Sequence, residues 1–354
     1  MKTFRRIGVL TSGGDAPGMN AAVRAVTRTA LERGVEVMAI YRGYSGLISG
    51  DIKPLQVRDV SNIINKGGTV LYSDRCPEFK TEEGMAKAIE NCKKFGIDGI
   101  VAIGGDGTFR GATDLTAHGV PCIGIPGTID NDIASTDATI GFDTAMNTVT
   151  EIIDKLRDTC ESHARCNVVE VMGRGAGDIA LSTGIASGAT AVVIPEFPHD
   201  DGSICRKIKK GRQLGKRNFI VVVSEGVGSD YAPALAKMIE QETGVETKFA
   251  RLAHIVRGGN PTLRDRLLAS RMGVYAVEQL LKGNSNLVIC ERRGVITATD
   301  INYALILDRK YKGKLKEGDL DAFTAEQIAQ MDADIAEKQA SMLELYSVEN
   351  KINL

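Results

Sequence analysis

The sequence predicts an α/β protein of two doubly wound, Rossmann-like layers, in which mostly parallel sheets are flanked by helices. The first observation behind this prediction is that short runs of β-branched residues alternate along the chain with longer stretches of helical periodicity. The second is that these runs are apolar at consecutive positions, which is typical of parallel strands covered by helices on both faces. The third is that glycine-rich turns directly follow several runs, where ligands bind in such folds.

The first half of the chain has the clearest alternation of the two patterns. Strands are expected at residues 7–10, 35–41, 99–103 and 122–125, and helices at residues 20–33, 82–95 and 144–157. The second half repeats the pattern, with strands at residues 168–172, 191–194 and 219–224 and helices between them. Strand–helix alternation of this kind predicts parallel sheets and therefore the doubly wound class.

Residues 324–345 have the pattern of an amphipathic helix. Thr324 and Gln327 have the spacing of a capping box at its start. One apolar stripe contains Ile328, Met331, Ile335, Met342 and Leu345. We expect this stripe to pack on its own domain, and docking of a partner is the less favoured alternative.

Length, charge and cysteine usage narrow the function classes. A chain of 354 residues suggests about two domains. The 44 lysines and arginines against 45 acidic residues give a net charge of -1, which argues against nucleic acid or a membrane as a partner. We find no apolar run long enough for a membrane span or a signal sequence. Seven cysteines without paired spacing indicate reduced thiols and a cytoplasmic location.

Three loops that directly follow predicted strands carry the candidate binding residues. They are residues 11–20, 104–108 and 126–132. Glycines at a strand-to-helix turn let backbone N–H groups approach phosphate oxygens, and the helix N-terminus adds partial positive charge. One such turn alone is better explained as a plain tight turn. Two of them, together with a loop bearing two carboxylates, indicate a nucleotide phosphate site.

Carboxylates and arginines at strand ends complete the candidate site. Asp130 and Asp132 are two residues apart, so in an extended segment they point the same way. Phosphoryl transfer needs a base for the attacking hydroxyl and Mg²⁺ on the phosphates, and such a pair would serve both needs. Asp106 is a further candidate metal ligand, with loop capping as the alternative role of each aspartate. Arg75 and Arg174 would neutralise the transferring phosphoryl group.

The four histidines show no metal-binding spacing, which argues against a zinc hydrolase. His254, which lies close to Arg257 and two glycines, is the functional candidate among them. His118 is expected at the C-terminus of a helix.

From residue 7 to about residue 271 the chain closely resembles bacterial ATP-dependent 6-phosphofructokinases. The segments that carry the resemblance are residues 8–20, 75–79, 104–108, 126–132, 169–174, 224–226, 254–259 and 268–273. The loop 126–132 is highly specific, whereas the turn 104–108 also occurs in NAD kinases and lipid kinases. The resemblance implies a glycolytic phosphotransferase that converts MgATP and fructose 6-phosphate to ADP and fructose 1,6-bisphosphate.

The resemblance also implies roles for individual residues. Those expected around ATP are Gly14, Arg75, Cys76, Gly105, Asp106, Gly107 and Thr108, with Asp106 binding Mg²⁺. Those expected around fructose 6-phosphate are Thr128, Asp130, Arg165, Met172, Gly173, Arg174, Glu225, Lys248, His254 and Arg257. The catalytic residues would be Asp130, Thr128, Arg174 and Asp132. Asp130 would take the proton from the sugar 1-hydroxyl.

Two glycines bear on the phosphoryl donor. Pyrophosphate-using relatives typically carry an acidic residue at the position of Gly107 and a lysine at that of Gly127. Those side chains fill the space that the α-phosphate of a nucleotide would occupy. Glycine at both positions leaves that space open, so the resemblance implies ATP as the donor.

The resemblance further implies a homotetramer with active sites shared between subunits. Arg165 resembles an arginine that reaches into the site of a neighbouring subunit. A second arginine is expected beside it, but Lys248 stands at that position and lacks the bidentate fork. This departure keeps open a kinase of the same fold that acts on another sugar phosphate, such as sedoheptulose 7-phosphate. A non-catalytic sugar-phosphate sensor is a second alternative, against which the intact acidic and arginine residues argue.

The family's effector site is only partly matched. Arg24, Arg28, Arg157 and Lys216 match its phosphate-binding cations, whereas Val57, Thr190 and Leu214 replace charged residues. We therefore expect weak or absent activation by ADP.

Two domains are expected on the same basis. A nucleotide-binding domain would contain residues 1–140 and about 256–305. A sugar-phosphate-binding domain would contain residues 141–255 and about 306–354, including the C-terminal helix.

Overall fold

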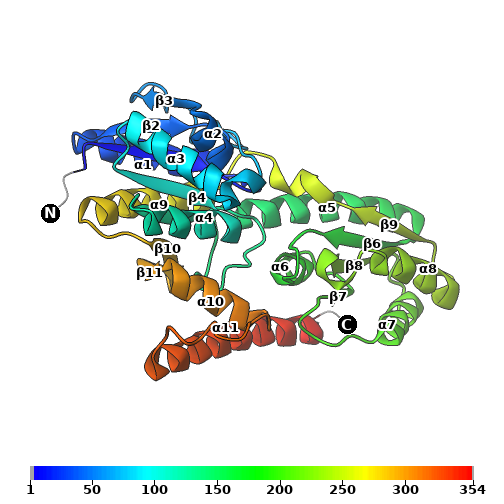
Figure 1. Cartoon of the computed structure of the whole chain (residues 1–354). Coiled ribbons are helices and arrows are strands. Elements are labelled where there is room, and N and C mark those ends of the chain that lie inside the picture. Colours follow the sequence, from blue (N-terminus) through cyan, green and yellow to red (C-terminus); the bar gives the residue numbers. More distant parts are fainter. Residues whose placement is uncertain (1–3, 353–354) are drawn as a thin grey trace. The chain divides into compact units, whose positions relative to one another are not determined.

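The computed structural model describes residues 4–352 and divides into two compact units (Figure 1). The first unit comprises Met1–Ile129, Ile133–Asp143 and Arg257–Ile335, and the second comprises Asp130–Asp132, Thr144–Val256 and Ala336–Leu354. The three residues 130–132 thus belong to the second unit, although the strand before them belongs to the first.

The first unit is built on a seven-stranded sheet with the order β11-β10-β5-β4-β1-β2-β3. Its strands are β1 (Arg6–Thr11), β2 (Glu36–Ile40), β3 (Ile52–Leu55), β4 (Gly99–Gly104), β5 (Cys122–Pro126), β10 (Leu287–Arg292) and β11 (Val295–Asp300). The five central strands pair in parallel, and the edge strands β3 and β11 pair antiparallel with β2 and β10. The carboxyl ends of β1, β4 and β5 therefore lie at one edge of the sheet.

Helices cover both faces of this sheet, as expected for a doubly wound fold. They are α1 (Met19–Glu32), α2 (Gly43–Ser49), α3 (Glu82–Lys94), α4 (Asp106–Ala117), α9 (Leu263–Leu281) and α10 (Ile301–Tyr311). Helices α1 and α9 lie side by side (Figure 1). Their close approach depends on Gly273, because a Cβ there would lie 2.6 Å from Cβ of Ala25. Helices α2, α3, α4 and α10 share a core on the other face that includes Phe109 and Leu115.

The second unit is built on a parallel four-stranded sheet with the order β7-β8-β6-β9. Its strands are β6 (Cys166–Val171), β7 (Ala191–Val193), β8 (Phe219–Ser224) and β9 (Thr247–Arg251). The accompanying helices are α5 (Phe142–His163), α6 (Asp178–Ala186), α7 (Asp201–Gln213) and α8 (Tyr231–Thr243). Phe219 and Val221 of β8 pack with α7 and α8. Alternate strand residues face opposite ways, and on the opposite face Gly184 of α6 lies against Val192.

The predicted fold class is confirmed, and each strand predicted from the sequence is present within two residues of its expected ends. The sequence did not predict β3, β9, β10 or β11. β3, β9 and β11 lie at sheet edges, where polar residues replace the apolar run that marks a buried strand. β10 does contain such a run, at residues 287–290, which the sequence analysis missed. His118 caps the C-terminus of α4, as predicted, and its Nδ1 lies 2.8 Å from O of Asp114. Within residues 4–352, no helix is both long and apolar enough to cross a bilayer.

The C-terminal helix α11 (Ala325–Ile352) is longer than predicted. Its capping box is confirmed: Thr324 N–H donates to Oε1 of Gln327 at 2.9 Å, and Gln327 N–H donates to Oγ1 of Thr324 at 3.2 Å. Met331 and Met342 are buried, but Leu345 is 41% exposed, so its predicted place in the buried stripe is wrong. The buried face continues at Glu349, seven residues or about two turns beyond Met342, and Leu345 falls on its flank.

The two halves of α11 fall in different units. Residues up to Ile335 group with the first unit, where Met331 packs with Leu307 and Ala134. Residues from Ala336 group with the second. The sequence-based division into binding domains, which assigns everything after about residue 305 to the sugar-phosphate-binding domain, stays a prediction.

Candidate active site

In the turn between β4 and α4, glycines leave the backbone accessible, because they have no side chains to cover it. β4 ends at Gly104, Gly105 is the N-cap of α4, and the helix begins at Asp106. A Cβ built on Gly105 or Gly107 would meet no heavy atom of the described residues within 4 Å. The first turn of a helix also carries unsatisfied N–H groups and partial positive charge. The turn therefore has the geometry and polarity to receive a phosphate group.

The turn that follows β1 lies beside it. Ser12 N–H donates to O of Ile103 at 3.0 Å, and Oγ1 of Thr108 donates to O of Ser12 at 3.1 Å. A Cβ built on Gly13 would lie 3.8 Å from Oγ1 of Thr108. Parallel pairing of β1 with β4 brings their carboxyl ends together. The two glycine turns that the sequence singled out thus form one continuous surface.

Arg257 lies against this surface. Its Nη1 is 2.9 Å from the place that a Cβ on Gly14 would take, so a larger residue at position 14 would displace the guanidinium. Nε of Arg257 is buried and makes no hydrogen bond within residues 4–352. The resemblance implies a place for Arg257 at the sugar phosphate, which stays a prediction, and its guanidinium lies beside Gly14, which is expected at ATP. Arg75 is exposed, and Cys76 is partly buried.

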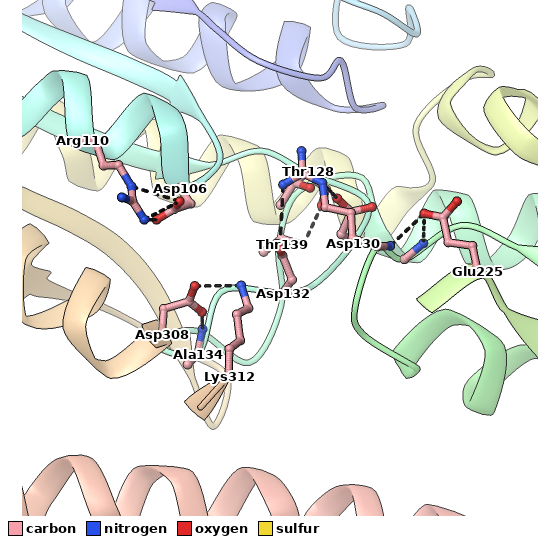
Figure 2. Close-up of polar contacts among 12 residues, drawn as sticks. Asp106, Arg110, Thr128, Asp130, Asp132, Ala134, Thr139, Glu225, Asp308 and Lys312 are labelled. Carbon is pink, nitrogen blue, oxygen red and sulfur yellow. Dashed lines mark hydrogen bonds and ion pairs between the residues drawn. The ribbon is translucent and has the colours of Figure 1, made fainter. Parts of the chain in front are cut away.

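Asp106 is paired with Arg110 one turn further along α4 (Figure 2). Arg110 donates from Nε to Oδ2 of Asp106 at 3.1 Å and from Nη2 to Oδ1 at 3.3 Å. In the described part of the chain, no three His, Cys, Asp or Glu side chains gather in a group that could hold a metal ion. Mg²⁺ on a nucleotide is bound mainly by phosphates and waters and needs one or two protein carboxylates. Asp106, at the phosphate-accepting turn and 30% exposed in its side chain, fits that role.

The loop that follows β5 is anchored in the first unit on both sides of residues 130–132. Gly127 N–H donates to O of Gly104 at 2.9 Å, next to the glycine turn. Oγ1 of Thr139 donates to O of Thr128 at 2.6 Å (Figure 2). Beyond the aspartates, Ala134 N–H donates to Oδ1 of Asp308 at 3.2 Å. Only Thr128 and Ile129 separate Gly127 from Asp130, so the chain itself keeps Asp130 within about 11 Å of this edge.

Within the second unit, Asp130 forms an ion pair with Arg174. Asp130 is 2% exposed, and its Oδ2 lies 3.0 Å from Nε of Arg174. Oδ2 of Asp132 lies 4.0 Å from Nη1 of the same guanidinium. One arginine therefore serves both carboxylates, which offsets the repulsion expected between two neighbouring negative charges.

A carboxylate holds the backbone of Arg174 in place. Arg174 has a left-handed φ of 53°, which is uncommon for a residue with a side chain. Oε1 of Glu225 accepts from Gly173 N–H at 3.2 Å and from Arg174 N–H at 2.8 Å (Figure 2). Gly173 cannot be replaced without strain, because a Cβ would lie 2.6 Å from O of Ala176. Buried Met172 joins this turn to β6, so several predicted sugar-binding residues are gathered here.

Arg165 and Lys248 lie at the other end of β6. Arg165 precedes its first residue, and Lys248 pairs with Asn167, whereas Arg174 lies three residues beyond its last residue. A strand of six residues spans about 20 Å. Within one chain, these two cations therefore lie far from the guanidinium of Arg174.

Both cations bind Glu246 instead. Arg165 Nε lies 2.7 Å from Oε2 of Glu246, and Lys248 Nζ lies 2.8 Å from Oε1. Hydrogen bonds from Arg165 and then Lys248 lower the pKa of Glu246 to about 2. His254 is exposed on the 3-10 turn Ala253–Arg257.

Similarity to known proteins now identifies the family. The profile of the family described as Phosphofructokinase matches residues 6–280. The ATP-dependent 6-phosphofructokinase of Bacillus velezensis is 60% identical over 280 residues, which cover 79% of this chain and 87% of the relative. The chain belongs to the phosphofructokinase family. The ATP-dependent 6-phosphofructokinase of Clostridium botulinum is 54% identical over 312 residues, 88% of this chain and 97% of the relative.

A solved structure supports the same assignment. Phosphofructokinase from Saccharomyces cerevisiae matches with a TM-score of 0.84 and 33% identity, over 97% of this chain and 49% of that one.

Several residues that hold the site lie beyond the phosphofructokinase profile, which ends at residue 280. Asp308 holds Ala134, and Lys338 Nζ donates to O of Asn131 at 3.3 Å. These partners are 174 and 207 residues apart in sequence, so no local pattern marks them. The one local signal in the sequence is the four-residue spacing of Asp308 on α10 and Lys312 at its C-cap, whose side chains form an ion pair of 2.7 Å.

Proposed function

We propose that this phosphofructokinase family member transfers the terminal phosphoryl group of MgATP to the 1-hydroxyl of fructose 6-phosphate, giving ADP and fructose 1,6-bisphosphate. The observation that carries the proposal is the buried carboxylate of Asp130, which lies 3.0 Å from Arg174 Nε and four residues beyond the end of β5, the strand that pairs with β4 and so ends beside its glycine turn. The names of the relatives from Bacillus velezensis and Clostridium botulinum support the same reaction.

Asp130 is the base in this proposal. Its carboxylate accepts the proton of the sugar hydroxyl as the oxygen attacks the terminal phosphorus. Arg174 stabilises the negative charge of the transferring group, and the hydrogen bonds from the Gly173 and Arg174 N–H groups to Glu225 keep that guanidinium in place. Thr128 and Asp132 flank the base in the chain and complete the proposed catalytic set.

The glycine surface of the first unit is the proposed seat of ATP. Gly14, Gly105 and Gly107 offer backbone N–H groups, and α4 directs its positive end at the phosphates. Thr108 shapes this turn, because its N–H donates to O of Gly105 at 2.9 Å. Asp106 is the proposed protein ligand of Mg²⁺, which would shield the charge of the phosphates when it is bound with the nucleotide. Binding the metal requires Asp106 to loosen its ion pair with Arg110.

The open space at Gly107 supports ATP rather than pyrophosphate as the donor. Gly127 carries less weight in this argument. A Cβ there would lie 3.1 Å from both Ile103 Cγ2 and Met19 Cε, so packing alone favours glycine at this position.

The position of Arg165 and Lys248 supports a shared site. Because both lie a strand's length from Arg174, they would serve the sugar phosphate of a neighbouring subunit. We therefore propose a homo-oligomer, and a homotetramer as its form. Glu246 would hold the two cations ready for that neighbour.

A coupled assay of purified protein tests the proposal. We expect ADP release that depends on fructose 6-phosphate and on Mg²⁺, with ATP far better than pyrophosphate as the donor. A higher kcat/KM with sedoheptulose 7-phosphate would overturn the assignment of the acceptor. Binding of the sugar phosphate without any turnover would overturn the assignment as an enzyme.

A further inference from the structure

Asn131, between the two aspartates of the catalytic loop, is held from two directions. Its backbone is left-handed, with φ of 51°, a conformation that asparagine adopts more readily than most residues. Its Nδ2 donates to Oδ1 of Asp178 at 3.3 Å, and its carbonyl oxygen accepts from Nζ of Lys338 at 3.3 Å. These contacts to the side chain and the backbone of Asn131 together fix the backbone at this residue. They therefore help to orient its two neighbours, Asp130 and Asp132.

Asp178 belongs to a pair of carboxylates at the start of α6. Asp178 is the first residue of the helix, and Gly177 N–H donates to Oε1 of Glu196 at 2.7 Å. Burial raises the pKa of both Asp178 and Glu196, and the positive charge of Lys338 opposes that rise in each. Oε2 of Glu196 is buried and accepts no hydrogen bond within residues 4–352. The positive charge of Lys338 therefore stabilises the charged forms of two buried carboxylates, those of Asp178 and Glu196.

Packing fixes the position of Lys338 on α11. Met342, one turn further along, is 7% exposed. The ring of Tyr346 stacks on Phe197, with centroids 4.4 Å apart and an interplanar angle of 20°. Phe197 directly follows Glu196 in the chain, so the stacking holds α11 beside the same loop that carries this carboxylate. The packing of α11 therefore fixes the position of the Lys338 ammonium group.

We propose that Lys338 is a positioning residue for phosphoryl transfer, which holds the loop 130–132 in its active conformation by binding O of Asn131 and balancing the charge of Asp178. This inference rests on the proposed function, since Asp130 is the base of that reaction. It assigns a role in the active site to the C-terminal helix, which lies outside the segment that defines the family.

The first test is Lys338→Met, which keeps most of the side chain's length and removes its charge. We expect kcat with fructose 6-phosphate to fall about 10- to 100-fold, because small displacements of catalytic groups cost that much. The KM for MgATP should stay within about twofold, since the glycine turns belong to the first unit. Lys351→Met, an exposed position on the same helix, is the matched control and should behave as the wild type. Lys338→Arg, which keeps the charge, should recover part of the lost kcat.

A second measurement does not depend on turnover. Hydrogen–deuterium exchange of residues 126–134 should be faster in Lys338→Met than in the wild type and in Lys351→Met. The double variant Lys338→Met/Asp178→Asn removes the unbalanced carboxylate and keeps an acceptor for Asn131. It should exchange more slowly than Lys338→Met and regain activity. This variant also decides the matter if Lys338→Met alone melts too low to assay.

The outcomes separate this inference from the proposed function. Unchanged kcat and unchanged exchange in Lys338→Met, with an active wild type, would overturn the role of Lys338 alone. An equal fall in kcat in Lys338→Met and in Lys351→Met would also overturn it. Both substitutions would then act by destabilising the helix in general and not through the contact of Lys338 with the loop. A wild type without turnover of fructose 6-phosphate would instead remove the proposed function, while faster exchange in Lys338→Met would still show that Lys338 holds the loop.

Discussion

Nε of Arg174 lies 3.0 Å from Oδ2 of Asp130, and this ion pair joins the turn after β6 to the loop after β5. The carboxylate is 2% exposed, whereas the arginine side chain is 55% exposed. One end of the pair is thus fixed in the protein, and the other reaches solvent, where a phosphorylated substrate would arrive. This difference in exposure suits the proposed roles of the two residues. Asp130, as the base, must stay in place, and Arg174 must contact the substrate.

Asp130→Ser should lower kcat about 100- to 10,000-fold with a modest change in KM for fructose 6-phosphate, because general-base catalysis contributes factors of this size. Steady-state kinetics in the coupled assay measure both quantities. Asp154→Ser, an exposed aspartate on α5, is the matched control and should be close to the wild type. Turnover retained in Asp130→Ser, with an unchanged melting temperature, would remove Asp130 from the mechanism.

Gly107→Asp should lower kcat/KM for ATP by roughly tenfold or more, equivalent to at least about 1.4 kcal/mol. The new carboxylate would enter the open space at this turn and repel the nucleotide phosphates. The fold should tolerate it, because an acidic residue in the first turn of α4 interacts favourably with the helix dipole. Gly107→Ala is the control: its Cβ meets no described atom within 4 Å, so ATP kinetics should change little. Equal ATP kinetics in both variants would contradict the placing of the α-phosphate at Gly107.

Much of the fold and part of the site could be predicted from the sequence. The buried strands β1, β4 and β5 are continuous apolar runs, and the glycines that end them are visible as local motifs. The parallel order of strands then brings two glycine turns together without further information. A local pattern that recurs at neighbouring strand ends is therefore enough to locate the glycine surface where we propose that ATP binds.

The remaining parts depend on contacts between distant segments. No spacing rule connects Arg174 to Glu225, or Asn131 to Lys338, because tertiary packing alone places them together. Leu345 lies three residues beyond Met342, which is less than one full turn of 3.6 residues, so it falls on the flank of the buried face. The contact of Arg257 with Gly14 also depends on tertiary packing and has no local pattern in the sequence.

Alkylation at pH 8 should modify Cys76 first among the seven cysteines. Burial raises the pKa of Cys92 and Cys166 to about 12 and that of Cys122 further still, so almost none of these thiols is ionised at pH 8. Cys76 is partly buried, whereas the other six cysteines are buried. Mass spectrometry after timed exposure to iodoacetamide would identify the labelled site.

MgATP should slow the labelling of Cys76, since this residue is expected at the nucleotide. Cys76→Ser should remove the fast labelling phase and serves as the control. Labelling of Cys92 at the same rate would contradict the protection expected from burial. Labelling of Cys76 that MgATP leaves unchanged would remove Cys76 from the nucleotide site.

ADP should fail to activate the enzyme at low fructose 6-phosphate. Of the positions that match the effector site of the family, Arg157 is bound to Oδ1 of Asn218 at 2.8 Å. Thr190 is 3% exposed, so it offers neither a charge nor an accessible ligand for an effector's metal. Leu214 is 79% exposed and Val57 49% exposed, so apolar groups meet solvent where cations are expected.

Initial rates against fructose 6-phosphate, with and without ADP, test this expectation. ADP should act only as a product inhibitor, raising the apparent KM for ATP and leaving the sugar saturation curve unchanged in shape. The double variant Val57→Arg/Leu214→Lys restores two cations at exposed positions, where substitution has little effect on stability. It should bind ADP more tightly than the wild type outside the active site, which calorimetry in the presence of a non-hydrolysable ATP analogue would measure. A leftward shift of the wild-type sugar curve at low ADP would show that the remaining cations are sufficient and that the lost charges do not abolish regulation.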